Sequence, residues 1–244
     1  MHIVVVNPNT TRAMTDLIEA GARAVAGPGT RIDAVTSAMG PASIESHYDE
    51  ALSVPGLLDA IRQAEAGPDP VAGYVIACFG DPGLDAAREL ASVPVIGTAE
   101  AAFHTASHLG RGFSVVTTLG RTLGRAADLL EHYGMSRFCL GLHACDLPVL
   151  ALDTDPEARK IVTEACRRAV EHDDSDAVVL GCAGMTDLAG HIAAELGVPV
   201  VDGVAAATLT VQSLATMGLR PCGRGEFAPP PRKLYTGTLR DFGS

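Results

Sequence analysis

The chain has 244 residues, 47% of them hydrophobic and 19% charged, with a formal net charge of −11 and no tryptophan. This composition predicts a compact protein with one large or two small hydrophobic cores and excludes a disordered chain. The negative charge argues against nucleic acid or an anionic membrane as a partner. No apolar run reaches the roughly 18 residues that a membrane-spanning helix needs.

Strand and helix patterns alternate along the first half of the chain. Runs of β-branched residues predict strands, and amphipathic runs bounded by glycine and proline predict helices. In chain order we expect strands at 2–7, 31–36, 71–78 and 93–96. The helices expected between these strands are 10–26, 53–65 and 83–90.

The second half repeats this order of elements. We expect strands at 112–117, 136–143, 177–182 and 198–201. The expected helices are 122–133, 155–171, 186–196 and 203–217. Apolar strands that alternate with amphipathic helices are typical of parallel sheets covered on both faces. The predicted fold class is therefore α/β, with two similar lobes, each a mostly parallel sheet flanked by helices.

We expect a pseudo-two-fold axis to relate the two lobes, with the active site between them. Residues 1–97 form the first lobe and residues 98–211 the second. The proline-rich C-terminal tail is expected to pack back on the first lobe, which then also includes residues 212–244.

Two short stretches look like copies of each other, and each ends in a cysteine followed by a glycine-containing turn. Val-Ile-Ala-Cys-Phe-Gly places Cys78 after the third strand, and Val-Leu-Gly-Cys-Ala-Gly places Cys182 after the corresponding strand of the second half. A Val-Pro-Val segment follows both, with its proline 16 positions after Cys78 and 17 after Cys182. Such a duplication can bring two thiols face to face across the pseudo-two-fold axis. One use for such a pair is to move a proton from one face of a carbon to the other.

The ends of parallel strands are where α/β proteins bind ligands. The free N–H groups at a following helix start favour negative charge, so we expect the thiolate form of both cysteines to be favoured. The competing interpretation is that a cysteine after a buried strand is an inert small hydrophobic residue. We expect that inert role for the four cysteines outside the repeat, which are Cys139, Cys145, Cys166 and Cys222.

Several further motifs resemble the hydantoin racemase family, which includes allantoin racemase and belongs to the aspartate/glutamate racemase superfamily. They are Asn-Pro-Asn-Thr-Thr at 7–11, Gly-Pro-Ala-Ser-Ile-Glu at 40–45, Ala-Cys-Phe-Gly-Asp at 77–81, Val-Val-Thr-Thr at 115–118, Asp-Leu-Pro-Val-Leu at 146–150 and Gly-Cys-Ala-Gly-Met at 181–185. The match covers nearly the whole chain in order and spacing. One departure is the turn after Cys78, which reads Phe-Gly-Asp where many family members carry two acidic residues.

The resemblance implies a racemase of 5-substituted hydantoins, allantoin among them, that needs no cofactor or metal. It implies Cys78 and Cys182 as the two bases, a small-molecule substrate and a homo-oligomer. Lacking a recognisable signal peptide, the chain is expected in the cytoplasm with reduced thiols. The residues expected to bind substrate are Asn7, Ser43, Phe79, Gly80, Thr117, Thr118, Ala183 and Gly184.

Three alternatives stay open at this point. An amino-acid racemase or a decarboxylase of the same superfamily would use the same fold. A non-catalytic two-lobed binding protein would use both cysteines only for packing. The apolar and glycine residues after both cysteines suit a neutral planar ring better than a free amino acid.

Overall fold

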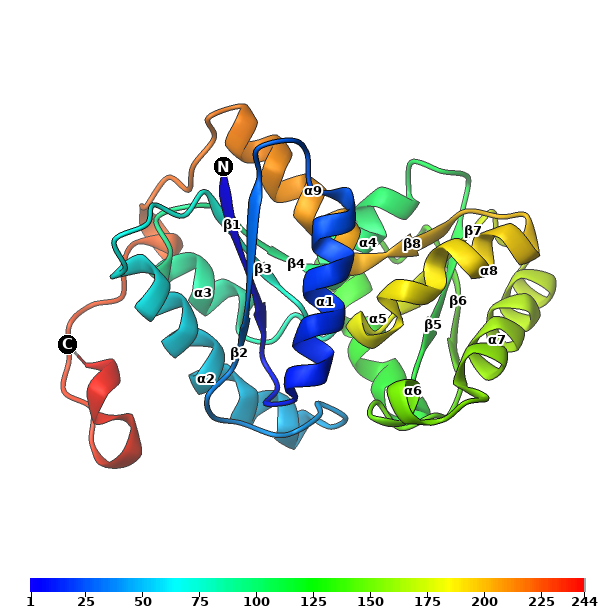
Figure 1. The fold of residues 1–244 in the computed structure, drawn as a ribbon, viewed down its shortest axis with the longest axis horizontal. Helices are drawn as coiled ribbons and strands as arrows, with labels where there is room; N and C mark the ends of the chain where they lie inside the picture. The colour runs from blue at the N-terminus through cyan, green and yellow to red at the C-terminus, as the bar shows by residue number, and fades with distance from the viewer. Residues whose placement is uncertain (244) are drawn as a thin grey trace.

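A computed structural model describes residues 1–243 of the chain as two four-stranded sheets (Figure 1). The first sheet contains β1 (His2–Asn7), β2 (Arg31–Thr36), β3 (Gly73–Ile76) and β4 (Val95–Gly97). The second contains β5 (Phe113–Thr117), β6 (Cys139–Ala144), β7 (Ala177–Gly181) and β8 (Val200–Asp202). Their strand orders, β2-β1-β3-β4 and β6-β5-β7-β8, correspond position by position, and every pairing is parallel. The predicted α/β fold class is confirmed.

Helices connect the strands in both lobes. Those of the first half are α1 (Arg12–Val25), α2 (His47–Glu65), α3 (Leu84–Leu90) and α4 (Thr98–Ala106). Those of the second half are α5 (Leu123–His132), α6 (Ala151–Thr154), α7 (Ala158–Asp173), α8 (Ala189–Leu196) and α9 (Gly203–Thr216). Short 3₁₀ segments are η1 (Gly120–Thr122), η2 (Ala183–Leu188), η3 (Gly225–Phe227) and η4 (Gly237–Phe242). None of the helices within residues 1–243 is both long and apolar enough to cross a membrane.

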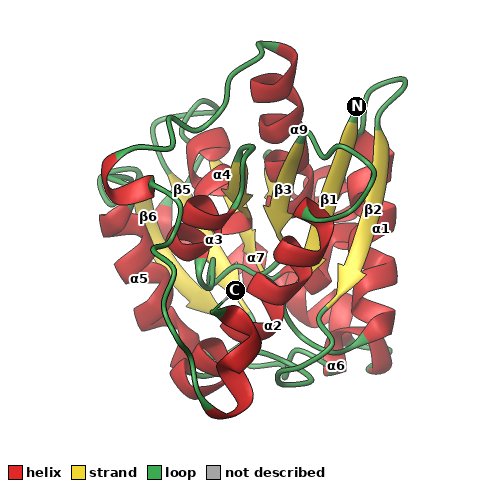
Figure 2. Cartoon of the chain, turned by 90° about the vertical axis from the view of Figure 1, so that its left-hand side faces the viewer, coloured by secondary structure: helices red, strands yellow, loops and turns green. Residues whose placement is uncertain are grey.

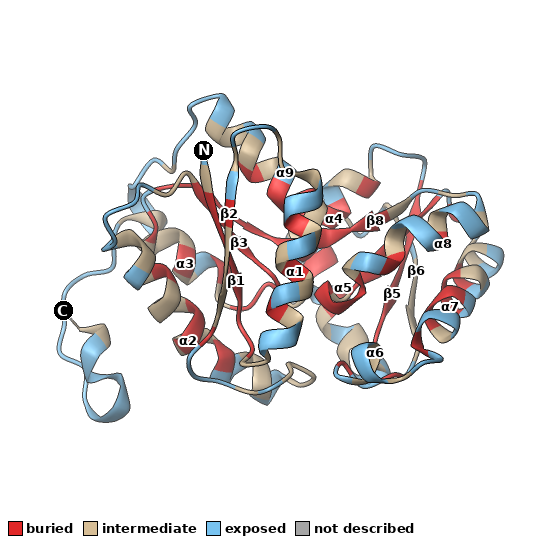
Figure 3. Ribbon diagram, in the orientation of Figure 1, coloured by how far each residue is buried: buried red, intermediate tan, exposed pale blue. Residues whose placement is uncertain are grey.

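The first sheet packs against apolar residues on both faces. Successive side chains of a strand point in opposite directions, so one strand contributes to both faces. In β1, Ile3 and Val5 belong to one apolar cluster with Ile18 of α1. Val4 and Val6 belong to another cluster, with α2 and α3. The continuous hydrophobic run of β1 therefore contributes to two cores. Helices lie on both sides of the strands (Figure 2), and every residue of β1 and β3 except His2 is buried (Figure 3).

Helices α4 and α9 cross between the lobes. Helix α4 follows the last strand of the first sheet but packs against β7 and β8 of the second. Helix α9 follows the last strand of the second sheet but packs against β1, β3 and β4 of the first, and against α1. The two helices also contact each other, so the lobes exchange their final helices across the interface.

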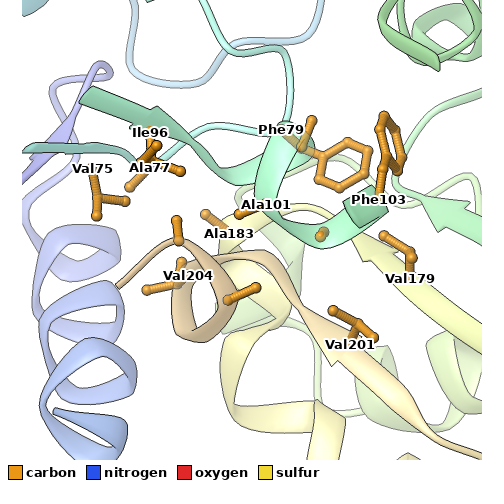
Figure 4. Packing of buried hydrophobic residues seen from close by; sticks show 14 of the residues in the cluster. Val75, Ala77, Phe79, Ile96, Ala101, Phe103, Val179, Ala183, Val201 and Val204 are labelled. Carbon is orange, nitrogen blue, oxygen red and sulfur yellow. The ribbon is translucent and has the colours of Figure 1, made fainter. Parts of the chain in front are cut away.

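One apolar core therefore belongs to both lobes. It joins Val75 of β3 to Val179 of β7, with Phe103 of α4 and Val204 of α9 among the residues between them (Figure 4). The ring of Phe103 lies edge-on to Phe79, with 5.4 Å between ring centroids, and stacks on Phe113 at 5.8 Å. The residue after Cys78 is thus anchored in the shared core.

Two expectations about helices were wrong. No helix was predicted at α4, because six of its nine residues are buried and only a narrow polar stripe remains on its surface. Helix α2 starts at His47 rather than at residue 53, because Ser46 caps it by accepting a hydrogen bond from the Asp49 N–H at 3.1 Å. Pro55 lies inside the helix.

The C-terminal tail contacts elements of the first lobe. Segment η3 packs against α3. The guanidinium of Arg62 in α2 lies over the ring of Phe242, 5.3 Å from its centroid, and donates a hydrogen bond to the carbonyl of Asp241.

Candidate active site

Both cysteines of the repeated unit lie at the carboxyl ends of their sheets and line one cavity between the lobes. Cys182 directly follows β7, and Cys78 follows β3 after one intervening alanine. The cavity has about 80 Å³ open to water-sized molecules. Its walls are formed by Asn9, Met14, Ile44, Ser46, His47, Glu50, Ala77, Cys78, Phe79, Gly80, Thr117, Thr118, Arg121, Thr122, Arg125, Ala126, Val149, Gly181, Cys182 and Ala183.

The two thiols have equivalent surroundings. Burial raises the pKa of Cys78 to about 12, although a hydrogen bond from the Gly80 backbone N–H favours the thiolate and the nearby Cys182 disfavours it. Burial likewise raises the pKa of Cys182 to about 12 against a hydrogen bond from the Gly184 backbone N–H. The expectation that the thiolate forms are favoured was wrong, because desolvation outweighs one backbone donor at each sulfur.

Alkylation by iodoacetamide should therefore accelerate about tenfold per pH unit from about pH 7 to 9 at both cysteines, without a plateau. Only the thiolate reacts, and a pKa of about 12 lies well above this range. Mass spectrometry of the two modified peptides gives each rate separately. A cysteine in a short blocked peptide is the control, since its rate should level off near a pKa of about 8.5. A plateau below pH 9 at either cysteine would contradict the prediction.

Five of the eight residues expected to bind substrate line the cavity. They are Phe79, Gly80, Thr117, Thr118 and Ala183. The other three, Asn7, Ser43 and Gly184, do not line it. Gly184 lies just behind the wall, where a Cβ would be 3.6 Å from the Cys182 sulfur, and Ser43 is partly exposed in the loop before α2.

The two adjacent threonines differ in what they can offer a ligand. The Thr117 hydroxyl donates to the carbonyl of Gly181 at 2.9 Å, so its proton is already engaged. The Thr118 hydroxyl has no hydrogen bond to any of residues 1–243, although Thr118 is almost completely buried. Thr118 is therefore the threonine with a free donor for a substrate carbonyl.

Asn7 is fully buried, and its side chain serves the protein interior. Its Nδ2 donates to Asn9 Oδ1 at 2.9 Å and to Thr15 Oγ1 at 3.0 Å. Its Oδ1 accepts from the Asn9 backbone N–H at 3.2 Å. The residue from this loop that reaches the cavity is Asn9, which the sequence pattern did not single out.

Charged residues from distant parts of the chain also reach the cavity. Arg125 of α5 pairs with Glu50 of α2 at 2.9 Å, and its guanidinium donates twice to the carbonyl of Gly80, at 2.7 and 3.1 Å. Burial raises the pKa of Glu50, while Arg125 opposes this shift. Arg121, also in the wall, is exposed and has no ion pair with any of residues 1–243. Both arginines belong to the second lobe, and Arg125 reaches across to the Cys78 turn of the first, so their places in the sequence did not indicate this contact.

A second contact between the lobes links the loop before α2 to the cavity wall. The Val149 backbone N–H donates to Glu45 Oε1 at 2.8 Å. Glu45 precedes α2 in the first lobe, whereas Val149 lies just before α6 in the second. Together with the pair between Glu50 and Arg125, this hydrogen bond ties the two lobes at the cavity.

Asp81 fixes the far end of the turn that carries Cys78. Its backbone is left-handed, with φ of 44°, and its N–H donates to the Cys78 carbonyl at 2.9 Å. Its buried carboxylate accepts from the N–H groups of Ala99 at 3.1 Å and Glu100 at 2.9 Å, and from the Tyr133 hydroxyl at 2.8 Å. Burial nevertheless raises the pKa of Asp81 to about 6. Asp81 thereby links the Cys78 turn to the start of α4 and to the second lobe.

Gly97 leaves the space that the Asp81 carboxylate occupies. A Cβ at position 97 would lie 2.2 Å from Asp81 Cγ. In the second lobe the corresponding helix start is capped by a residue next to it in the chain. Asp202 caps α9 by accepting from the N–H groups of Val204 and Ala205 at 3.1 and 2.9 Å.

Two matching α/β lobes, with one thiol from each facing a shared cavity, define the architecture of this protein. A family model described as Asp/Glu/Hydantoin racemase matches residues 3–211, and the chain belongs to this family. It is therefore a racemase, an enzyme of the isomerase class.

Individual relatives match over nearly their whole length. The chain is 44% identical to the hydantoin racemase of Pseudomonas sp. (strain NS671), over 100% of this chain and 97% of that protein. It is also 44% identical to the hydantoin racemase of Rhizobium meliloti, over 97% of this chain and 98% of that protein. The solved structure of allantoin racemase from Klebsiella pneumoniae is similar with a TM-score of 0.96 and 50% identity, covering 100% of this chain and 99% of that one.

Proposed function

We propose that the protein racemises 5-substituted hydantoins without a cofactor, with Cys78 and Cys182 as its two bases. The observation that carries this proposal is the placement of the two thiols. They come from matching turns of two matching lobes, line one cavity, and each meet the backbone N–H of the glycine two residues further along the chain.

The hydantoin C5–H lies next to a ring carbonyl, so removal of this proton gives an enolate. One cysteine, as thiolate, takes the C5 proton from one face of the ring and becomes a thiol. The other cysteine, as thiol, returns a proton to the opposite face and becomes the thiolate. The two sulfurs exchange roles between the two directions, so one negative charge is shared by the pair.

A thiolate in this cavity is a strong base because burial raises the pKa of both thiols to about 12. A high pKa suits the removal of a weakly acidic carbon-bound proton, but it keeps the reactive form scarce at neutral pH. Donors beside the cavity offset the charge of the enolate. The Thr118 hydroxyl is one such donor, and removing one donor from an oxyanion site costs about 3–4 kcal/mol.

The chain should racemise neutral hydantoins faster than free amino acids, because apolar and glycine residues follow both thiols. Polarimetry on enantiopure allantoin, 5-alkyl and 5-aryl hydantoins, aspartate and glutamate measures this preference directly. A non-enzymatic rate measured without protein is the control, since hydantoins racemise slowly in water. Equal or faster turnover of aspartate or glutamate would contradict the proposal.

One observation favours a second candidate, an amino-acid racemase. Arg121 is an exposed cation in the cavity wall with no ion pair among residues 1–243, and such a group can bind an α-carboxylate. The aspartate and glutamate arms of the same assay test this candidate.

A further inference from the structure

The loop after β1 holds an asparagine in one fixed orientation at the cavity wall. Asn9 Oδ1 accepts hydrogen bonds from Asn7 Nδ2 and from the Thr11 backbone N–H, both at 2.9 Å. An amide nitrogen cannot accept either bond, so these two donors determine which end of the Asn9 side chain is oxygen. The NH₂ group must therefore point away from them.

The Asn9 NH₂ group lacks a strong acceptor. Its nitrogen lies 3.0 Å from Met14 Sδ, and a thioether sulfur is only a weak acceptor. Asn9 is 4% exposed, yet it lines the same cavity as Cys78 and Cys182. An amide nitrogen carries two hydrogens, so at least one N–H is left without a strong acceptor in a nearly water-free wall beside both thiols.

A buried N–H without an acceptor costs free energy, so a ligand that accepts from the Asn9 NH₂ group would bind favourably here. Met14 also links Asn9 to the second thiol, because its methyl group is 3.7 Å from the position of a Cβ on Gly184, next to Cys182. The donor thus lies where the β1 loop of the first lobe meets the Cys182 turn of the second.

We propose that Asn9 is an oxyanion donor, whose Nδ2–H binds the substrate oxygen that becomes negative when C5 loses its proton. This inference rests on the proposed racemisation of hydantoins and adds a catalytic residue to it. The donor is held in place before the reaction by Asn7 and Thr11, so it needs no reorganisation as the charge develops.

A purely structural role for Asn9 makes a different prediction. The structural contacts use only Oδ1, which accepts from Asn7 and Thr11. Aspartate keeps an oxygen in that position but replaces the NH₂ donor with a second oxygen. Asn9→Asp therefore preserves the support of the loop and removes the proposed donor, but it also adds a negative charge; the neutral Asn9→Ser variant removes the donor without that charge.

The test compares Asn9→Asp with the wild type on an enantiopure hydantoin at about pH 8. We expect kcat and kcat/KM to fall by the same factor, about 10²–10³, because the lost interaction forms only as the charge develops. Deuterium exchange at C5 in D₂O should slow by the same factor. Asn9→Ser is a second variant, too short to reach as a donor, and should show a similar loss in kcat.

Thr36→Val is the matched control. The Thr36 hydroxyl hydrogen-bonds Thr15 Oγ1 at 2.7 Å, at the far end of the network that supports Asn7, and Thr36 does not line the cavity. This variant should keep kcat within about threefold of the wild type. Melting curves of all variants report whether each is folded.

A folded Asn9→Asp enzyme with kcat within about threefold of the wild type would overturn the role of Asn9 and leave the proposed function intact. An equal loss of kcat in Thr36→Val would also overturn it, because the loss would then come from the network. A wild-type protein that racemises no hydantoin would instead reject the proposed function, and the role of Asn9 with it.

Discussion

Replacing either Cys78 or Cys182 by alanine should stop the interconversion of hydantoin enantiomers, with kcat falling by about 10²–10⁴-fold. Each thiol serves one face of C5, so the remaining thiol can still remove the proton from one enantiomer. In D₂O each variant should therefore exchange deuterium into one enantiomer only, and the favoured enantiomer should be opposite for the two variants. Chiral chromatography with mass detection measures both quantities in one experiment.

Cys145→Ser is the matched control for this pair. Cys145 lies near Cys182, whose thiolate it disfavours, but its thiol contacts the Thr118 carbonyl and it does not line the cavity. The serine variant should racemise at close to the wild-type rate. Substantial racemisation by either alanine variant would show that a single base reaches both faces, and the two-base mechanism would then be wrong.

Asp81→Ala should lower the stability of the protein by about 3 kcal/mol. The change removes the cap of α4 and leaves two backbone N–H groups and the Tyr133 hydroxyl without their buried partner. For a chain of this size the melting temperature should fall by about 6–12 °C. Asp85→Ala is the control: Asp85 is exposed in the first turn of α3, and its loss should change the melting temperature little.

Gly97→Ala should also be destabilising, because its Cβ would displace the Asp81 carboxylate from the N–H groups that it caps. Once Asp81 is alanine, this clash is gone and the new methyl group fills the space left by the carboxylate. The double variant should therefore lose less stability than the sum of the two single variants. Additive losses would show that the carboxylate and the Gly97 site do not compete for space.

The repeated pattern of the chain predicted the eight strands and their arrangement into two parallel sheets. This succeeded because central strands buried on both faces leave continuous β-branched runs, as in β1 and β7. It failed for α4, whose alanine-rich sequence is buried on most sides and shows only a narrow polar face at Glu100 and His104. The start of α2 was missed because Ser46, which caps the helix, was interpreted as part of a polar loop.

The candidate site was likewise predicted only in part from the sequence. Cys78 and Cys182 could be placed on one cavity because each follows a strand of the repeat, and strand ends meet at one sheet edge; their catalytic roles remain predictions. Arg125 and Glu50 could not be found this way, since each reaches the cavity from a helix of a different lobe. Asn7 was chosen over Asn9 because position in a motif does not show which amide faces the cavity.

The exchange of α4 and α9 between the sheets means that the two halves are not separable modules, despite their matching architecture. A fragment ending at Gly97 would lack α9, which covers its sheet, and the complementary fragment would have to bury α9 without β1, β3 and β4. Each fragment would expose apolar surface that the intact chain buries in the shared core. A gene split at this point should therefore give active enzyme only when both fragments are produced together.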